Sequence, residues 1–276
     1  GDHRHIESLA EGTASAGAPV PLATMPRGAT AGQMIHLVFE HLDFQCTEAE
    51  EIRLLCRSSL ASHGIERPGL ETTLTETLPA ILRTPLAPER FCLADIRKSE
   101  RLDELEFNIP VRSRGILNAA MLADAMEARS APPWPEDYPR ALRSLDFKPL
   151  SGFLKGFMDL VFVHEGRFYL VDYKSNDLGE RAEHYGEAAL QQSMAEHHYY
   201  LQYHLYLVAL QRYLRLRLSN YDYETHMGGV FYLYLRGMDP SHPAGCGVFY
   251  DRPRAAELDH LDQVLRGEDS SQEARP

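Results

Sequence analysis

The chain has 276 residues, 44% of them hydrophobic, and carries a formal net charge of −12. This content can form a sizeable core, but no stretch approaches the roughly 18 uninterrupted apolar residues of a membrane helix, so neither a membrane span nor secretion is indicated. The negative charge argues against a protein that binds nucleic acid through its own surface charge, because phosphate affinity normally comes from clustered Lys and Arg.

The first half of the chain is expected to be a linker followed mainly by helices. Residues 1–29 are rich in Gly, Ala, Ser and Pro, as linkers are. The missing initiator Met is expected of a piece of a longer protein, although processing or a cloning junction gives the same start. The spacing of apolar residues then predicts three helices, at residues 30–42, 47–62 and 70–82. A strand at residues 104–111, a helix at 117–128 and a proline-rich loop at 131–139 are expected to follow.

Residues 152–176 are expected to form a β-hairpin that carries two aspartates and a lysine. Two apolar runs flank the polar turn at residues 164–167, so Val163 should pair with Phe168, and Asp159 should then face Asp172. Like charges that face each other destabilise a strand pair unless a cation lies between them. Lys174 follows Asp172 by two residues, so its ammonium should point to the same side of the sheet.

The second half of the chain predicts a long helix, a buried strand and a short end region. A helix is expected over residues 195–218 and an unbroken apolar strand over 228–235. An edge strand at residues 247–250, a last helix at 255–265 and a disordered tail at 267–276 complete the chain. The folded domain is therefore expected to span residues 30–266.

Two carboxylates and a lysine at the centre of an α/β sheet suit metal-assisted phosphodiester hydrolysis. Carboxylate oxygens hold a hard Mg²⁺, and a nearby ammonium can orient the attacking water or stabilise the oxyanion. Asp159 could instead be a strand-end carboxylate in a salt bridge, and Lys174 a solvated lysine at the sheet edge. The spacing of the residues does not decide between these readings.

The same residues resemble a known signature. Gly156 to Asp159, followed by Val171 to Lys174, is similar to the paired motif of the PD-(D/E)xK nuclease superfamily. Four segments together resemble the C-terminal nuclease domain of RecB subunits of exodeoxyribonuclease V: residues 26–44, 154–176, 201–214 and 221–239. The resemblance implies a restriction-endonuclease-like α/β fold, with a central mixed β-sheet flanked by helices.

The resemblance also implies roles for individual residues. His36, Asp159, Asp172 and the main-chain carbonyl of Tyr173 would bind the metal, and Asp159, Asp172 and Lys174 would be catalytic. Gln202 and Tyr206, four residues apart on one helix face, match a motif expected to support the active site and lie near DNA. Mg²⁺ is the expected cofactor. Mn²⁺ should substitute, and Ca²⁺ should bind without turnover because it is larger and a poorer Lewis acid.

By the same resemblance, the chain would be the Mg²⁺-dependent DNA nuclease module of a cytoplasmic bacterial helicase-nuclease that processes double-strand DNA ends for recombinational repair. RecC-like and RecD-like subunits would be its partners. Delivery of single strands by the motor would offset the acidic charge. The alternative is a catalytically silent nuclease fold that serves for docking. Such a fold is expected to lack the aspartates or the lysine, and all three are present.

For four polar residues the sequence leaves alternatives open. A lone histidine on an amphipathic helix, such as His36, is more often a buried side chain than a ligand, and only the resemblance favours ligation. Glu106 is either a supporting acid near the metal or a polar position on a buried strand. His197 and His198 are adjacent on the predicted helix and should point apart, which disfavours a shared metal.

Overall fold

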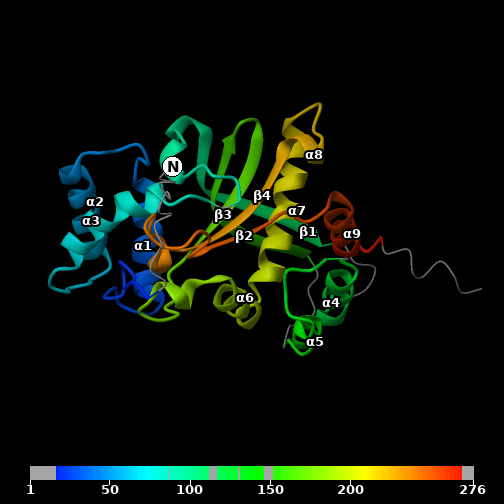
Figure 1. The fold of residues 1–276 in the computed structure, drawn as a ribbon. Helices are drawn as coiled ribbons and strands as arrows, with labels where there is room; N and C mark the ends of the chain where they lie inside the picture. The colour runs from blue at the N-terminus through cyan, green and yellow to red at the C-terminus, as the bar shows by residue number, and fades with distance from the viewer. Residues whose placement is uncertain (1–16, 87, 112–116, 130, 146–151, 269–276) are drawn as a thin grey trace, which may run out of the picture.

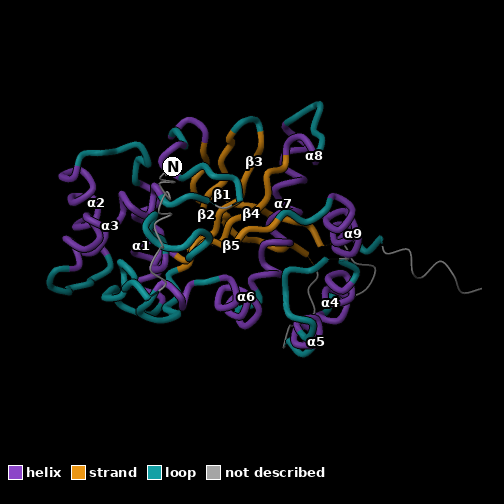
Figure 2. Tube along the Cα trace, in the orientation of Figure 1, coloured by secondary structure: helices purple, strands orange, loops and turns teal. Residues whose placement is uncertain are grey.

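The computed structural model describes residues 17–86, 88–111, 117–129, 131–145 and 152–268. One five-stranded sheet in the order β1-β2-β3-β4-β5 forms its centre, and Figure 2 shows the strands enclosed by helices. The strands are β1 Arg101–Val111, β2 Gly152–His164, β3 Arg167–Lys174, β4 Met227–Tyr234 and β5 Val248–Asp251. Strands β3 and β4 are parallel and the other neighbours antiparallel, so the predicted mixed sheet is confirmed.

Helices cover both faces of the sheet (Figure 1). One side is formed by α1 Ala29–His41, α2 Ala49–Ser62 and α3 Leu70–Arg83. The other side is formed by α4 Ala119–Glu127, α5 Tyr138–Arg143, α6 Glu187–Glu196, α7 Tyr199–Arg217 and α9 Ala255–Arg266. Each side has its own hydrophobic cluster against the sheet. The eight residues of β4, between the two clusters, are all buried, as the apolar run predicts.

The alternation of side chains along β3 decides what lies at the end of this strand. Tyr169, Val171 and Tyr173 join the cluster beside α1 to α3, whereas Leu170 joins the cluster beside α7. Because side chains alternate between the two faces of a strand, Asp172 and Lys174 share the side of Leu170. The end of β3 therefore presents an aromatic ring to α1, and a carboxylate and an ammonium to α7.

The predicted long helix over residues 195–218 is wrong in one respect, because two helices meet within it. Helix α6 ends at Glu196, and α7 begins at Tyr199 after His198, whose φ of 54° is left-handed. Periodicity does not reveal such a break, since both helices bury apolar residues in the same cluster. The break places Tyr199 in the first turn of α7.

The described part of the expected linker is packed against the domain. Val20, Leu22 and Met25 are buried, and the buried guanidinium of Arg236 donates to the carbonyls of Leu22 and Met25, each at 2.9 Å. The same guanidinium donates to Ser175 O at 2.9 Å. Arg236 thus joins the segment before α1 to the residue that follows Lys174. Residues 1–16, and residues 269–276 of the expected tail, lie outside the described residues.

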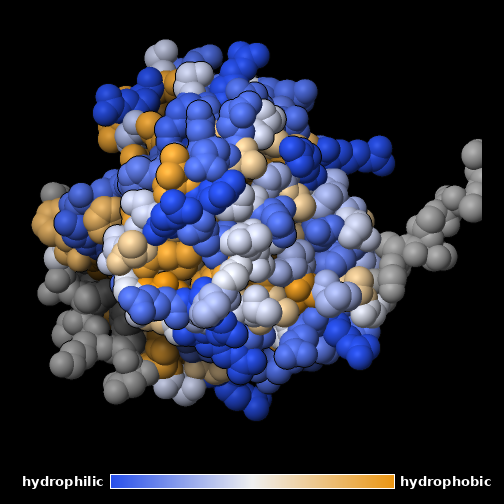
Figure 3. Space-filling view, turned by 90° about the vertical axis from the view of Figure 1, so that its left-hand side faces the viewer, coloured by the Kyte–Doolittle hydropathy of each residue, from blue (hydrophilic) through white to orange (hydrophobic). Residues whose placement is uncertain are grey.

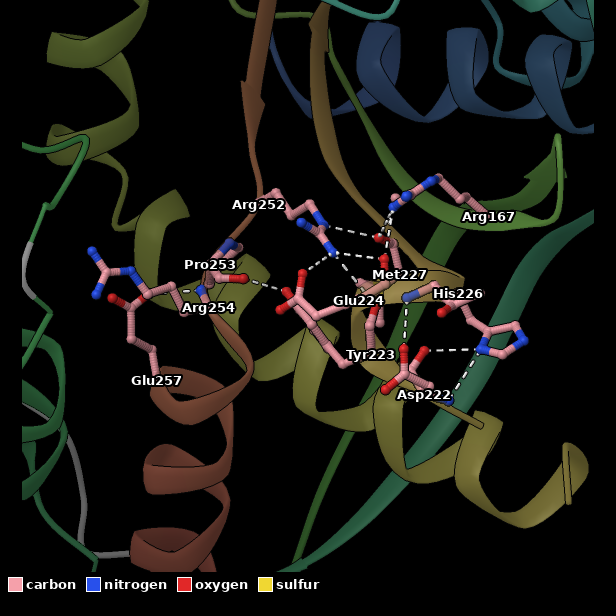
Figure 4. A network of polar contacts seen from close by, with 12 residues as sticks. Arg167, Asp222, Tyr223, Glu224, His226, Met227, Arg252, Pro253, Arg254 and Glu257 are labelled. Atoms are coloured by element: carbon pink, nitrogen blue, oxygen red, sulfur yellow. Dashed lines mark hydrogen bonds and ion pairs between the residues drawn. The ribbon is translucent and has the colours of Figure 1, made fainter. Parts of the chain in front are cut away.

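The end of the sheet away from Lys174 is held by two arginines (Figure 4). Arg252 donates to Met227 O at 2.9 Å and forms an ion pair with Glu224 at 2.8 Å. Arg167 donates to Glu224 O at 3.1 Å and to Met227 O at 3.3 Å. These contacts satisfy main-chain carbonyls where the short helix α8 Tyr223–His226 leads into β4.

The face formed by α1, α2 and α3 is mostly hydrophilic. Figure 3, which looks onto the side that α1, α2 and α3 form in Figure 1, shows mostly hydrophilic side chains with smaller hydrophobic groups among them. Within the described ranges, no helix combines the length and the apolar character needed to cross a membrane.

A buried polar network joins α7 to β5 and to the end of α4. Arg129 donates to both oxygens of Asp251, at 2.6 and 2.7 Å, and Tyr203 donates to the same carboxylate at 2.6 Å. The Arg129 side chain is 9% exposed and that of Asp251 10%. The network therefore neutralises a charge that would otherwise be costly to bury.

We expect Arg129→Met to lower the free energy of unfolding by about 3 to 5 kcal/mol, because it leaves the Asp251 carboxylate buried without its cation. Urea unfolding followed by circular dichroism measures this change. Arg143→Met is the matched control, since Arg143 pairs with Glu127 and Asp124 on the surface and its loss should change stability little. Equal destabilisation by the two substitutions would contradict the expectation.

Candidate active site

The predicted catalytic residues meet where β2 and β3 separate. Val163 pairs with Phe168 as predicted, but the ladder ends at Leu160 and Val171. The predicted pair of Asp159 directly facing Asp172 is therefore not formed, since it falls beyond the last ladder pair. Instead, Oδ2 of Asp159 accepts a hydrogen bond from the Tyr173 main-chain N–H at 2.7 Å. A side-chain carboxylate thus binds the strand where the ladder stops.

Asp172 and Lys174 form an ion pair on the α7 side of the sheet, as their spacing predicts. Nζ of Lys174 lies 2.5 Å from Oδ1 of Asp172, and Asp172 is only 4% exposed. Burial raises the pKa of Asp172, the Lys174 ammonium counteracts this shift, and the charge of Asp159 adds to it. Oδ1 of Asp172 is thus held by the Lys174 ammonium, and a cation bound to this oxygen would have to share it with the lysine.

Helix α1 brings His36 to the same place from a distant part of the sequence. Nδ1 of His36 lies 3.3 Å from Oδ1 of Asp159, and its ring meets the ring of Tyr173 edge-on. Burial alone would lower the pKa of His36, but the hydrogen bond to Asp159 and the charges of Asp159 and Asp172 raise it. His36 therefore lies in a site with excess negative charge.

Glu104, and not Glu106, is the further acid of the site. Asp103 pairs with Leu160 and Leu105 with Met158, so Glu104 lies between these pairs, opposite Asp159. It has a left-handed φ of 51°. Burial raises the pKa of Glu104, and the charge of Asp159 raises it further.

Glu106 lies on the surface, where it forms an ion pair with Lys155 at 2.6 Å. The two glutamates are two residues apart, so strand periodicity alone assigns their side chains to the same side of the sheet. Only the pairing with β2 separates them, so of the two alternatives for Glu106 the structure favours a polar position on the strand over a supporting acid near the metal.

Gln202 and Tyr206 lie beside Lys174 as the resemblance implies, and Tyr232 of β4 joins them. Tyr232 donates to Oε1 of Gln202 at 2.8 Å, and Nε2 of Gln202 donates to the Tyr206 hydroxyl at 3.0 Å. This arrangement turns Oε1 toward Lys174, whose Nζ donates to it at 3.3 Å. An ammonium has donors only, so the amide oxygen is the group it requires. Sequence patterns gave no sign of Tyr232, which reads as one more residue of a buried strand.

The site fits a divalent cation. His36, Glu104 and Asp159 each offer a ligand atom, and these atoms lie within 4.8 Å of one another. They line a cleft of about 430 Å³, together with Gly32, Gln33, Leu37, Glu40 and His63. Crowded carboxylates with raised pKa values and an imidazole form a donor set that a cation stabilises. The carbonyl of Tyr173 remains a predicted ligand.

Comparison with known proteins finds one nuclease superfamily and relatives that share one name. The sequence model of the PD-(D/E)XK nuclease superfamily matches residues 14–273. A protein named RecBCD enzyme subunit RecB from Escherichia coli K12 is 40% identical over 244 residues, which cover 88% of this chain and 19% of that protein. The proteins of the same name from Haemophilus influenzae and Mycolicibacterium smegmatis are 37% and 34% identical, covering 87% and 91% of this chain. The chain spans about a fifth to a quarter of the length of these relatives.

Proposed function

Since this chain belongs to the PD-(D/E)XK nuclease superfamily, we propose that it hydrolyses phosphodiester bonds in DNA with the help of a divalent metal ion. The observation that carries the proposal is that His36 and Asp159 line one cleft, and that Asp159 binds the main chain of Tyr173, the residue between the paired Asp172 and Lys174. The two aspartates and the lysine come from neighbouring strands, whereas His36 comes from a helix more than a hundred residues earlier.

Most residues of the site would bind the cation, whereas Lys174 would stabilise the negative charge that develops on the phosphate. His36, Asp159, Asp172 and the Tyr173 carbonyl would hold the metal, and Glu104, whose ligand atom lies within 4.8 Å of those of His36 and Asp159, would lie close to it. Bound there, the ion would lower the pKa of a water molecule and neutralise charge on the scissile phosphate.

Lys174 would donate hydrogen bonds to the attacking water or to the phosphate oxygen as negative charge develops. Its side chain is only 11% exposed, so its charge is less screened than it would be in water.

Mg²⁺ is the proposed natural ion. Carboxylate oxygens dominate the donor set and are the ligands that this hard cation prefers. His36 is a softer donor, so Mn²⁺ should also support the reaction. Ca²⁺ prefers oxygen ligands as well, but its larger size makes it a poorer Lewis acid, so it should bind without supporting cleavage.

We expect the purified protein to cleave linear duplex and single-stranded DNA with Mg²⁺ or Mn²⁺, and to be inactive with EDTA or with Ca²⁺ alone. Gel assays with labelled DNA measure cleavage, and the unfolding temperature reports Ca²⁺ binding, which should raise it. Cleavage in EDTA, or in Ca²⁺ at the rate seen with Mg²⁺, would refute the assignment. Binding of Ca²⁺ without cleavage under any condition would favour the silent docking module.

We further propose that this chain acts within a helicase-nuclease of the bacterial cytoplasm that processes double-strand DNA ends for recombinational repair. The support is the name of its relatives, RecBCD enzyme subunit RecB, of which it matches only a part. Subunits resembling RecC and RecD would be its partners, and a motor driven by ATP would deliver single strands. Such delivery explains how a chain with a net charge of −12 can act on DNA without binding it tightly by itself. Degradation of linear DNA by the complete complex should therefore require ATP.

A further inference from the structure

The ammonium of Lys174 is enclosed by two aromatic rings that have no assigned role. Its Nζ lies 3.8 Å from the ring centre of Tyr199 and 4.9 Å from that of Tyr232. The two rings lie 5.5 Å apart and are tilted by 39°. We propose that Tyr199 and Tyr232 are positioning residues, which hold the Lys174 ammonium against the site through their ring faces. This inference rests on the proposed nuclease function.

The rings come from separate elements that the fold brings together at the end of β3. Tyr232 lies on β4 beside Asp172 in the parallel ladder, and Tyr199 occupies the first turn of α7, directly after the left-handed His198. Because α7 begins at Tyr199, the break between α6 and α7 sets the position of the ring that lies over the Lys174 ammonium.

A lysine side chain needs such support because its flexible four-carbon stem can take many conformations. In this structure the ammonium is anchored by the carboxylate of Asp172 at 2.5 Å. The same carboxylate is the proposed metal ligand, so a bound cation competes with Lys174 for its oxygens. The two rings, and Oε1 of Gln202 at 3.3 Å, hold the ammonium without using that carboxylate.

The burial of the contact makes the rings effective. The attraction between a cation and a ring face increases when water is excluded, and the Lys174 side chain is 11% exposed. Tyr232 is fully buried, and its hydroxyl fixes the Gln202 amide. Tyr199 is half-buried, with its hydroxyl 3.4 Å from Oδ1 of Asn176. Tyr199 can therefore be changed with less damage to the core than Tyr232.

The test compares Tyr199→Leu, which removes the ring, with Tyr199→Phe, which keeps it, in the complete enzyme with Mg²⁺ and DNA. We expect Tyr199→Leu to lower kcat about tenfold, the effect of losing one desolvated cation–π contact. KM for DNA should not change, because the ring contacts the lysine and not the substrate. Tyr199→Phe should restore kcat. Tyr213→Leu, at a half-buried tyrosine further along α7, is the matched control and should keep the wild-type kcat.

A double-mutant cycle with Lys174→Gln separates positioning from a general structural effect. If the ring acts through the ammonium, Tyr199→Leu should have no further effect on the residual cleavage by the Lys174→Gln enzyme. The same loss in both backgrounds, an unchanged kcat in Tyr199→Leu, or a loss in Tyr199→Phe equal to that in Tyr199→Leu would each overturn the inference. Absence of cleavage by the wild-type enzyme would instead overturn the proposed function.

Discussion

Asp172→Asn is expected to reduce the rate of DNA cleavage by at least about a thousandfold, because a bound cation supplies several kcal/mol of charge stabilisation and this change removes one of its charged ligands. Asparagine has nearly the same shape, so the packing of the buried end of β3 should be kept. The initial rate on linear DNA at saturating Mg²⁺, compared with that of the wild-type protein, measures the effect.

Stability distinguishes a lost ligand from a lost fold. Burial raises the pKa of Asp172 in spite of its ion pair with Lys174, so its charged form is held at a cost without the metal. In EDTA, Asp172→Asn should therefore unfold at a temperature no lower than the wild-type protein, and Ca²⁺ should no longer raise that temperature. Asp124→Asn, at an exposed carboxylate on α4, is the matched control and should keep both cleavage and the Ca²⁺ effect. Wild-type cleavage by Asp172→Asn would remove Asp172 from the site.

Lys174→Gln is expected to lower kcat by about a hundredfold to a thousandfold, the usual effect of removing one preorganised donor to a developing charge. Glutamine keeps a polar side chain of similar reach that can still approach Gln202 and the tyrosine rings. The missing property is the positive charge, which matters most when negative charge develops on the phosphate. KM for DNA should change little, and single-turnover rates at saturating DNA isolate this effect.

The control for this change is Lys155→Gln, since Lys155 is an exposed lysine on β2 that pairs with Glu106. It should leave kcat unchanged. Ca²⁺ should still raise the unfolding temperature of Lys174→Gln, because the proposed metal ligands are intact. If Lys174→Gln cleaves DNA as fast as the wild-type protein, the lysine has only a structural role, as a partner of Asp172.

The buried charged side chains of the site are held in place by contacts from several elements. Asp159 accepts from the main chain of β3, Lys174 is paired and enclosed by rings, and Arg236 holds the residue that follows the lysine. Without such contacts, three neighbouring carboxylates would repel one another and separate the strands.

The sequence by itself determined the features that depend on neighbours along the chain. The hairpin follows from two apolar runs around a polar turn, and the common side of Asp172 and Lys174 follows from the period of two in a strand. The complete burial of β4 follows from its unbroken apolar run, and the positions of α1 and α3 within a few residues follow from local periodicity. The resemblance added His36 and Gln202, whose proximity to the hairpin no local pattern could predict.

Only the tertiary structure decided the features that depend on contacts between distant segments. Glu104 and Glu106 have the same parity, so the pairing of β1 with β2 alone places Glu104 opposite Asp159. The ladder between β2 and β3 ends one pair early because a side chain replaces a main-chain partner. The apolar spacing predicts one continuous helix, but the left-handed His198 breaks it, and the ring of Tyr199 therefore lies beside Lys174. Periodicity assigns a residue to a face of its own element, whereas the residue it meets is set by the packing of that face against another element.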